Sequence, residues 1–182
     1  MDNQKLLGLS LGILRIRRLF KNMNEILDIL EKNGPKTTCE QIARMLGKGD
    51  EEVASAISEL EKKNVIVGYK TLINWDQTER ERVTALIELR VTPQRGEGYD
   101  KVAERIYKYP QVKALYLMSG AYDLAVMIEG KSMKDVALFV AQKLATMETV
   151  VSTATHFVLK KYKDDGLEFY KDDKDSREVM SL

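Results

Sequence analysis

The stretch LYLMSGAYDLAVMIEG, residues 115–130, decides the fold of the second half of the chain. Two apolar runs flank a short turn at Ser119–Asp123, and this pattern predicts two strands joined by that turn. On the N-terminal side, residues 98–110 have the spacing of an amphipathic helix. Before that helix, residues 82–91 alternate between apolar and mostly polar side chains, as a half-buried strand does.

On the C-terminal side, Ser132 followed by Asp135 predicts the start of a second helix, and residues 150–162 read as a last strand. The resulting order, β-α-β-β-α-β, is typical of a ferredoxin-like domain, whose antiparallel sheet carries both helices on one face. The other face of such a sheet needs a cover. We therefore expect a dimer or a higher oligomer.

The first half has a helical period. Residues 23–33 form one apolar stripe, and Thr38 followed by Gln41 is a capping-box signature for a second helix. Asp50 is expected to cap a third helix, and the segment that follows it reads as an extended strand. Three short helices joined by tight turns predict a helix-turn-helix. The fold class is therefore α+β, with an N-terminal three-helix helix-turn-helix (winged-helix-like) domain and a C-terminal ferredoxin-like βαββαβ domain.

The predicted domain boundaries follow these changes of period. They are an N-terminal extension at 1–22, the helix-turn-helix domain at 23–68, a linking strand at 69–80, a ferredoxin-like oligomerisation domain at 81–163, and a charged tail at 164–182 that frays.

The first 22 residues carry five basic side chains against one acid, and their apolar run is too short to cross a bilayer. Three interpretations stay open: a surface amphipathic helix, a basic arm for DNA, or an extension from a misassigned start. The last is favoured because Met23 begins the next helix.

Composition excludes several classes of protein. The formal net charge of +1 argues against a uniformly basic nucleic-acid binder, and the single cysteine fits a reducing cytoplasm. The only histidine, His156, has no second histidine or cysteine near it in the sequence, so neither a metal site nor a nucleophile pair is expected. The glycines are scattered rather than gathered in a phosphate-binding loop. The chain is predicted to be a cytoplasmic protein without cofactor, metal, membrane partner or enzymatic activity.

The element order, with GYKTLINWD between the halves and the turn SGAYD at residues 119–123, resembles the Lrp/AsnC (feast/famine) transcriptional regulators over residue 23 to about residue 163. The resemblance implies DNA binding by the helix-turn-helix. It also implies a C-terminal domain that dimerises, assembles into larger oligomers up to an octamer, and often binds an amino acid between dimers.

The resemblance further implies an effector site made by the Gly-x-Tyr-Asp turn and by threonines of the last strand. In this sequence the matching residues are Gly120, Tyr122, Asp123, Thr153 and Thr155. Backbone N–H groups of a glycine turn suit a carboxylate, and an acidic side chain suits an ammonium. Ala121 stands where the family often has an acid, which removes one ammonium partner. Without the resemblance, the segment would read as an ordinary hairpin turn.

The helix expected to read DNA is acidic at its start. Asp50, Glu51 and Glu52 complement the helix dipole but repel phosphates. Residues 23–68 hold six basic and nine acidic side chains, which opposes non-specific DNA affinity. The expected DNA contacts are therefore limited to Lys48, Ser55, Ser58 and Lys62.

Two hypotheses of function follow. The first is a DNA-binding transcriptional regulator of the Lrp/AsnC type that oligomerises and senses an amino acid or a related effector. The alternative is a ligand-sensing and assembly module whose helix-turn-helix has weak or lost DNA binding.

Overall fold

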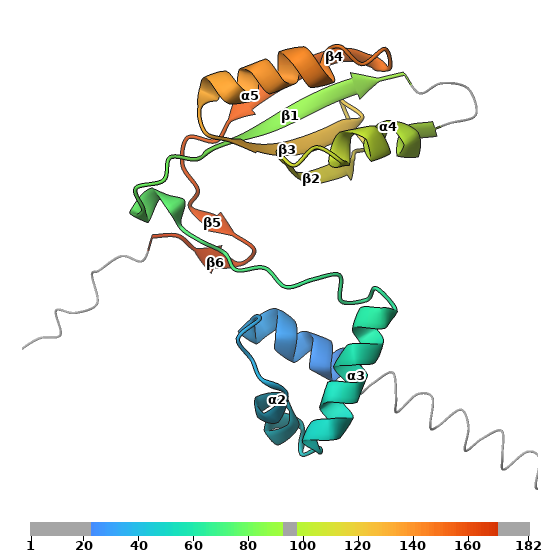
Figure 1. The fold of residues 1–182 in the computed structure, drawn as a ribbon, viewed down its shortest axis with the longest axis vertical. Helices are drawn as coiled ribbons and strands as arrows, with labels where there is room; N and C mark the ends of the chain where they lie inside the picture. Colours follow the sequence, from blue (N-terminus) through green and yellow to red (C-terminus); the bar gives the residue numbers. More distant parts are fainter. Residues whose placement is uncertain (1–22, 93–97, 171–182) are drawn as a thin grey trace, which may run out of the picture. The chain divides into compact units, whose positions relative to one another are not determined.

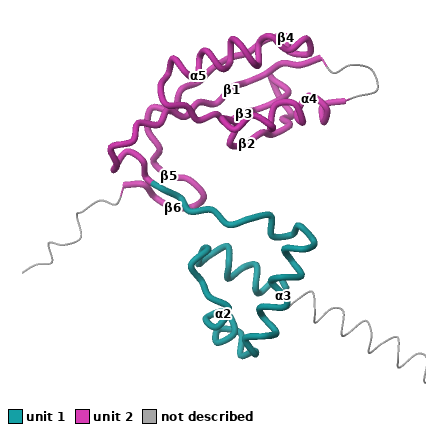
Figure 2. Tube along the Cα trace, in the orientation of Figure 1, with its two compact units in different colours: residues 1–73 teal, residues 74–182 magenta. Residues whose placement is uncertain are grey.

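The computed structural model describes residues 23–92 and 98–170, and it divides the chain into two compact units, Met1–Ile73 and Asn74–Leu182 (Figure 2). The predicted N-terminal extension, residues 1–22, lies outside the described residues. Within the described ranges, no helix combines the length and apolarity that crossing a bilayer requires.

The described part of unit 1 contains three helices: residues 23–33, α2 (Cys39–Leu46) and α3 (Asp50–Lys62) (Figure 1). Their apolar faces meet in one core, and its buried members are Ile26, Ile42, Ala43, Val53 and Leu60. Gly47 ends α2 in the left-handed conformation, at φ 63°, which glycine adopts without steric cost. The predicted helical half is confirmed in this arrangement.

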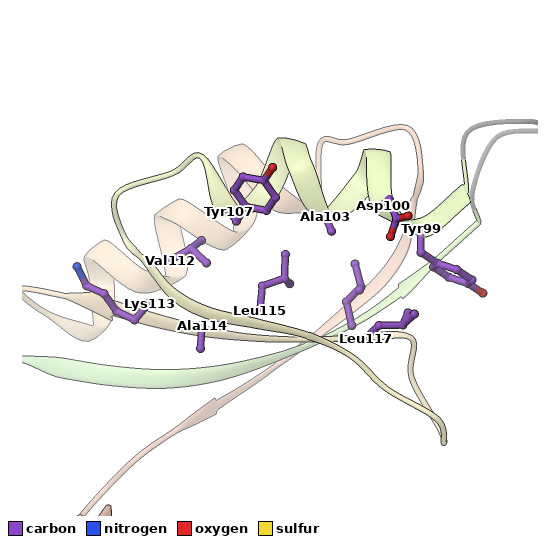
Figure 3. A pocket seen from close by; sticks show the side chains of 10 residues that line it. Tyr99, Asp100, Ala103, Tyr107, Val112, Lys113, Ala114, Leu115 and Leu117 are labelled. Atoms are coloured by element: carbon purple, nitrogen blue, oxygen red, sulfur yellow. The ribbon is translucent and has the colours of Figure 1, made fainter. Parts of the chain in front are cut away.

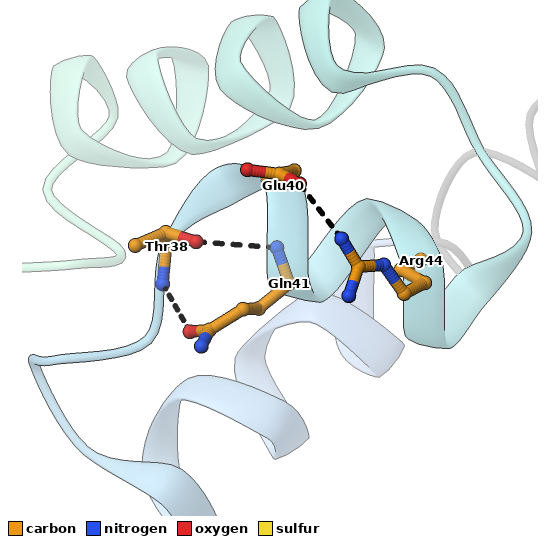
Figure 4. Close-up of polar contacts among 4 residues, drawn as sticks. All are labelled: Thr38, Glu40, Gln41 and Arg44. Carbon is orange, nitrogen blue, oxygen red and sulfur yellow. Dashed lines mark hydrogen bonds and ion pairs between the residues drawn. The ribbon is translucent and has the colours of Figure 1, made fainter.

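The capping box predicted for α2 is present (Figure 4). The backbone N–H of Gln41 donates to the Thr38 hydroxyl at 3.2 Å, and the backbone N–H of Thr38 donates to the Gln41 side-chain oxygen at 2.9 Å. An ion pair of 2.7 Å between Arg44 and Glu40 adds a contact one turn apart on the same helix. The start of α2 is thus fixed by its own sequence.

Two expectations for the first half were wrong in detail. Gly49, not Asp50, is the N-cap of α3, because the Gly49 carbonyl accepts the N–H of Val53 and Asp50 already belongs to the helix. The linking strand predicted at residues 69–80 does not form: residues 67–74 have no regular structure, and Trp75–Gln77 form a short 3-10 helix. They have no partner strand among the described residues, and a single extended segment has no ladder to join.

Unit 2 is built on a four-stranded antiparallel sheet with the strand order β2-β3-β1-β4 (Figure 1). The strands are β1 (Val83–Val91), β2 (Val112–Leu117), β3 (Leu124–Gly130) and β4 (Val150–Phe157). Helix α4 (Gly98–Tyr107) connects β1 with β2, and α5 (Met133–Phe139), continued by a π-helical turn at Val140–Leu144, connects β3 with β4. The predicted ferredoxin-like order is confirmed.

One face of this sheet is covered and the other is open. Ala85, Ile87 and Leu89 of β1 are completely buried and pack with Ile106 of α4 and Leu144 after α5 in a single core. The alternate residues of β1 point to the opposite face, where no described helix of unit 2 packs. The sheet therefore presents one face to its helices and leaves the other available.

The C-terminal end differs from the predicted charged tail. Lys163–Asp164 (β5) and Leu167–Glu168 (β6) pair as a small hairpin around Asp165 and Gly166, which have φ values of 45° and 78°. An Asp-Gly pair with two positive φ angles is the usual type I′ hairpin turn, so the sequence did contain the signal. Residues 171–182 of the predicted tail lie outside the described residues.

This hairpin fastens the beginning of unit 2. The Asn74 side-chain amide donates to the Phe169 carbonyl at 3.1 Å, and the Tyr170 hydroxyl donates to the Asp76 carboxylate at 2.9 Å. The Lys160 ammonium lies 4.1 Å from the centre of the Tyr170 ring, in a cation–π contact. The segment that follows the unit boundary is thereby held by residues more than ninety positions later in the chain.

Thr38→Ala should loosen α2 without changing the fold. The lost N-cap is worth about 0.5–2 kcal/mol, and we expect the α2 amides to exchange roughly 2- to 30-fold faster in hydrogen–deuterium exchange. Thr38→Ser, which keeps the hydroxyl, is the matched control and should exchange like the wild type. Equal rates in all three proteins would show that the capping box does not limit the opening of α2.

Candidate functional site

The turn at residues 119–123 connects β2 with β3 and is bound to the end of β1. The Asp123 backbone N–H donates to the Leu89 carbonyl at 2.9 Å, and the Asp123 carbonyl accepts the N–H of Met118 at 2.8 Å. These two bonds fix the base of the turn. Gly120 and Ala121, at its tip, are exposed.

The carboxylate of Asp123 is committed to the protein's own structure. One oxygen accepts the backbone N–H of Val91 at 2.8 Å, and the other accepts the Tyr99 hydroxyl at 3.3 Å. The pKa of the Tyr99 phenol is raised, mainly by the negative charge of Asp123, with burial and the hydrogen bond as smaller causes. Tyr99 therefore stays protonated at neutral pH and continues to donate. Asp123 was expected to accept a hydrogen bond from a ligand's ammonium. Its carboxylate already accepts hydrogen bonds from two donors of the protein.

The other side of the turn is tied to β1 by Arg90. The Arg90 Nε donates to the Ala121 carbonyl at 2.9 Å. Arg90 is exposed and lies on the open face of the sheet, because Leu89 and Val91 point toward the helices. No feature of the sequence around Arg90 indicates this contact, since it joins residues 31 positions apart.

The two threonines lie on the other side of β1. Thr153 pairs with Leu89, which also pairs with Leu124 next to the turn, and Thr155 pairs with Ile87 one step further away. Both threonines are half-buried on the helix-facing side. Because neighbouring strands are about 4.8 Å apart, Thr153 is separated from β3 by about 10 Å. One chain therefore brings the five expected effector residues to one region of the sheet without joining them in one pocket.

A separate groove runs between α4 and β2 (Figure 3). It has a volume of about 330 Å³, with Tyr107 and Ala103 of α4 on one side and Leu115 of β2 on the other. Tyr99 lies at one end of it, so the hydroxyl that binds Asp123 also borders this groove. The sequence analysis did not anticipate the groove, since helix and strand patterns do not report how closely two elements pack.

The expected DNA contacts lie on the outer side of α3 and just before it. Ser55 and Lys62 are exposed and Ser58 is half-buried, at the i, i+3 and i+7 positions of one helical face. Lys48 precedes the helix and, together with Ser55, lines a hollow of about 220 Å³ against the first helix. The buried side of α3 is formed by Val53 and Leu60, so these four residues do not serve the core.

The acids of α3 are partly neutralised within the unit. Glu59 accepts a hydrogen bond of 2.6 Å from the Lys63 ammonium, and this bond is the largest cause that lowers the pKa of the Glu59 carboxyl. Glu61 accepts the hydroxyl of Tyr69 at 2.9 Å. Asp50 and Glu51, in the first turn, have no such ion pair with a described residue. No described cation therefore offsets these two acids at the start of the helix.

No cluster of three or more metal-ligating side chains occurs in the described part of the chain. His156 lies on β4 with its Nε2 3.4 Å from the Glu88 carboxylate, and Cys39 is half-buried against the core of unit 1. Among residues 23–92 and 98–170, neither side chain is paired with the nucleophile or the base that catalysis at a histidine or cysteine requires.

Comparison with known proteins agrees with this arrangement. Residues 84–167 match the family model of the Lrp/AsnC ligand binding domain. The uncharacterized HTH-type transcriptional regulator YugG of Bacillus subtilis (strain 168) is 50% identical over 165 residues, which cover 90% of this chain and 99% of that protein. The HTH-type transcriptional regulator LrpA of Pyrococcus abyssi is 29% identical over 138 residues, 76% of this chain and 94% of the relative. Both relatives are regulators rather than enzymes.

A solved structure has the same fold. The transcriptional regulator NMB0573 of Neisseria meningitidis, in complex with L-Met, superposes with a TM-score of 0.63 over 79% of this chain and 92% of that chain, at 20% sequence identity. This likeness extends over both the helical half and the sheet half, and it confirms the architecture.

Asp123→Ala should destabilise unit 2, because the N–H of Val91 then loses its acceptor near the end of β1. A part-buried donor left unpaired costs about 1–3 kcal/mol, which urea denaturation followed by circular dichroism would detect. Asp123→Asn, whose side-chain oxygen can still accept, is the matched control and should lose less. A stability of Asp123→Ala equal to that of the wild type would show that water replaces the carboxylate at no cost.

Proposed function

The chain belongs to the Lrp/AsnC family of HTH-type transcriptional regulators, and from this premise we propose how its two units divide the work. Unit 1 binds double-stranded DNA through α3. Unit 2 assembles the protein into a dimer or larger oligomer and senses an amino acid or a related small molecule. The observation that carries the proposal is the one-sided packing of both units, since α3 and the sheet each bury one face and expose the other.

The DNA-binding part of the proposal assigns roles to four residues. Lys48 and Lys62 pair with phosphates at the two ends of α3, and the hydroxyls of Ser55 and Ser58 bind bases or phosphates between them. Glu51, one turn before Ser55, is suited to accept a hydrogen bond from a cytosine amino group. Because the first turn of α3 is acidic, the affinity depends on few phosphate contacts, and two heads in a dimer are needed to add enough of them.

The assembly part of the proposal rests on the open face of the sheet. Leu86 and Met127 lie opposite each other at its centre and are half-buried, and Ala125 beside them is small. A sheet that is apolar at the centre and polar around it is suited to pack against a second copy of itself. Within the described part of unit 2, the helices cover only one face of the sheet.

The sensing part of the proposal keeps the five effector residues but gives Asp123 a different role, that of positioning the turn. Gly120 and Tyr122 contact the ligand from the turn. Thr153 and Thr155, on β4, reach the same ligand only when a second chain completes the site. The L-Met bound to the Neisseria regulator supports an amino-acid-like effector for this chain. Asp123 acts as a positioning residue, because its carboxylate holds the turn in place.

Lys62→Gln should weaken DNA binding uniformly across sequences and reduce the slope of log Kobs against log salt concentration by about 1. Fluorescence anisotropy with the DNA upstream of the protein's own gene, from about 50 mM salt upward, measures both quantities. Lys134→Gln, on α5 of the other unit, is the matched control. The absence of any wild-type binding at about 50 mM salt would favour the alternative, a sensing and assembly module that has lost tight DNA binding.

Met127→Glu should convert the oligomer to a monomer, because burying an unpaired carboxylate at the centre of the interface costs several kcal/mol, about 3–5 by analogy with broken buried pairs. Light scattering gives the mass, and near-UV circular dichroism shows whether the variant is folded. Leu138→Glu changes an exposed leucine of α5 on the helical side and should leave the mass unchanged. A folded Met127→Glu protein with the wild-type mass would move the interface elsewhere.

A further inference from the structure

Another groove of unit 2 lies at the far end of β3 from the turn at residues 119–123, about 20 Å away along the strand. It has a volume of about 1090 Å³, which is enough for a ligand as large as a nucleotide. Its walls are the segment at residues 79–82 before β1, the adjoining ends of β2 and β3, and the exposed side of α5 with its π-helical turn. Because α5 packs on the covered face of the sheet, the groove is separate from the open face as well as from the turn.

Three lysines from different elements line this groove. Lys113 lies on β2, Lys131 follows the end of β3, and Lys143 lies in the π-helical turn after α5. The ammonium groups of Lys131 and Lys143 make no hydrogen bond or ion pair with a described residue. The Lys113 ammonium donates to the Pro110 carbonyl at 3.0 Å, a contact that holds it in place without cancelling its charge. Ammonium groups that converge on one hollow are suited to bind a phosphate.

Two of these lysines are placed by irregular backbone. The pairing of β2 with β3 shifts register between Val112 and Ala114, so Lys113 is the extra residue of a β-bulge. Lys143 lies in the π-helical turn Val140–Leu144, which is wider than the α-helix that it continues. Both irregularities re-aim side chains, and both are frequent beside functional sites. A helix that merely covers a sheet requires neither of them, yet the two occur at the same groove.

The wall before β1 brings acids. Glu79 and Glu81 line the groove from this segment, and their carboxylates have no ion pair with a described residue. Arg82, beside Glu81, is already occupied: its guanidinium lies 3.9 Å from the centre of the Trp75 ring and donates to the Glu129 carboxylate at 3.0 Å. Carboxylates of this kind accept hydrogen bonds from the hydroxyl groups of a sugar. The groove therefore offers cations for a phosphate and acceptors for hydroxyl groups.

We propose that this groove is a binding site for a phosphorylated sugar, either free or as part of a nucleotide. The three lysines bind the phosphate, and the carboxylates of Glu79 and Glu81 bind the sugar hydroxyls. Leu138, an exposed leucine of α5 in the same groove, packs against the apolar side of the sugar or of a base. This inference goes beyond the proposed function, because it gives unit 2 a second ligand of another chemical class and does not depend on amino-acid sensing.

The test compares ligands that differ in one group. The full chain is titrated with glucose 6-phosphate and AMP, with glucose and adenosine, and with inorganic phosphate. Isothermal calorimetry gives the affinity, and hydrogen–deuterium exchange of residues 111–113 and 131–143 locates the site. We expect a phosphorylated compound to bind and to protect both segments, and its unphosphorylated counterpart to bind about 10- to 100-fold more weakly. Binding of glucose 6-phosphate but not AMP identifies a free sugar phosphate, and the reverse identifies a nucleotide.

Substitutions separate the two halves of the site. Lys131→Gln and Lys143→Gln should each weaken the phosphorylated compound by about 10-fold, the effect of one lost charged hydrogen-bonding group. Glu81→Gln should weaken it as well but leave the affinity for inorganic phosphate unchanged. Lys134→Gln, an exposed lysine of α5 that does not line the groove, is the matched control and should bind like the wild type. Because all four side chains are exposed, the variants should keep the wild-type melting temperature without ligand.

Three results would overturn the inference: no binding of either phosphorylated compound, equal binding of glucose or adenosine, or wild-type affinity in both lysine variants. An amino acid that protects residues 131–143 instead of the turn would overturn the ligand class. The proposed DNA binding uses none of the groove's residues, so it is tested separately from this site.

Discussion

The hydrogen bond between the Asp123 carboxylate and the backbone N–H of Val91 sets the position of everything around the turn. Val91 is the last residue of β1, where the ladder with β4 shifts register, and its N–H would otherwise lack an acceptor in a half-buried place. By accepting it, Asp123 holds the turn between β2 and β3 against β1. Tyr99 of α4 joins the same carboxylate, so one acid connects a helix, a strand and a turn. The backbone bond from Asp123 to Leu89 and the bond from Arg90 to Ala121 hold the same turn against β1.

The parts of the fold that depend on local chemistry could be predicted from the sequence. Thr38 and Gln41 form the expected capping box, and β1 buries its alternate residues as its pattern indicates. Both signals are local, because a cap needs three residues and a strand face needs a period of two. The Asp165-Gly166 signal for a hairpin turn is equally local. The many charged residues around it nevertheless led to the prediction of a frayed tail.

The parts that depend on distant residues could not be predicted in this way. The sequence marks Asp123 as part of a functional turn but does not show that Val91 and Tyr99 occupy its carboxylate. Arg90 carries no sequence signal at all, because its contact with Ala121 depends on the register of three strands. The strand expected after α3 does not form for a related reason. Residues with high β-propensity form a strand only where another strand is available to pair with them. Contacts of this kind follow from topology, which a pattern in one segment does not contain.

The C-terminal hairpin also has a consequence for the order in which the protein is completed during synthesis. The N-terminal part of the chain leaves the ribosome first. Unit 1 and the four-stranded sheet can therefore form before the later residues are synthesised. Asn74 and Asp76, however, receive their partners only when Phe169 and Tyr170 emerge, because the two bonds span 95 and 94 residues. Until then the beginning of unit 2, at Asn74 and Asp76, lacks these two hydrogen bonds. A nascent regulator that stalls or is cut before residue 169 would thus carry unit 1 and the four-stranded sheet without the two hydrogen bonds that hold Asn74 and Asp76.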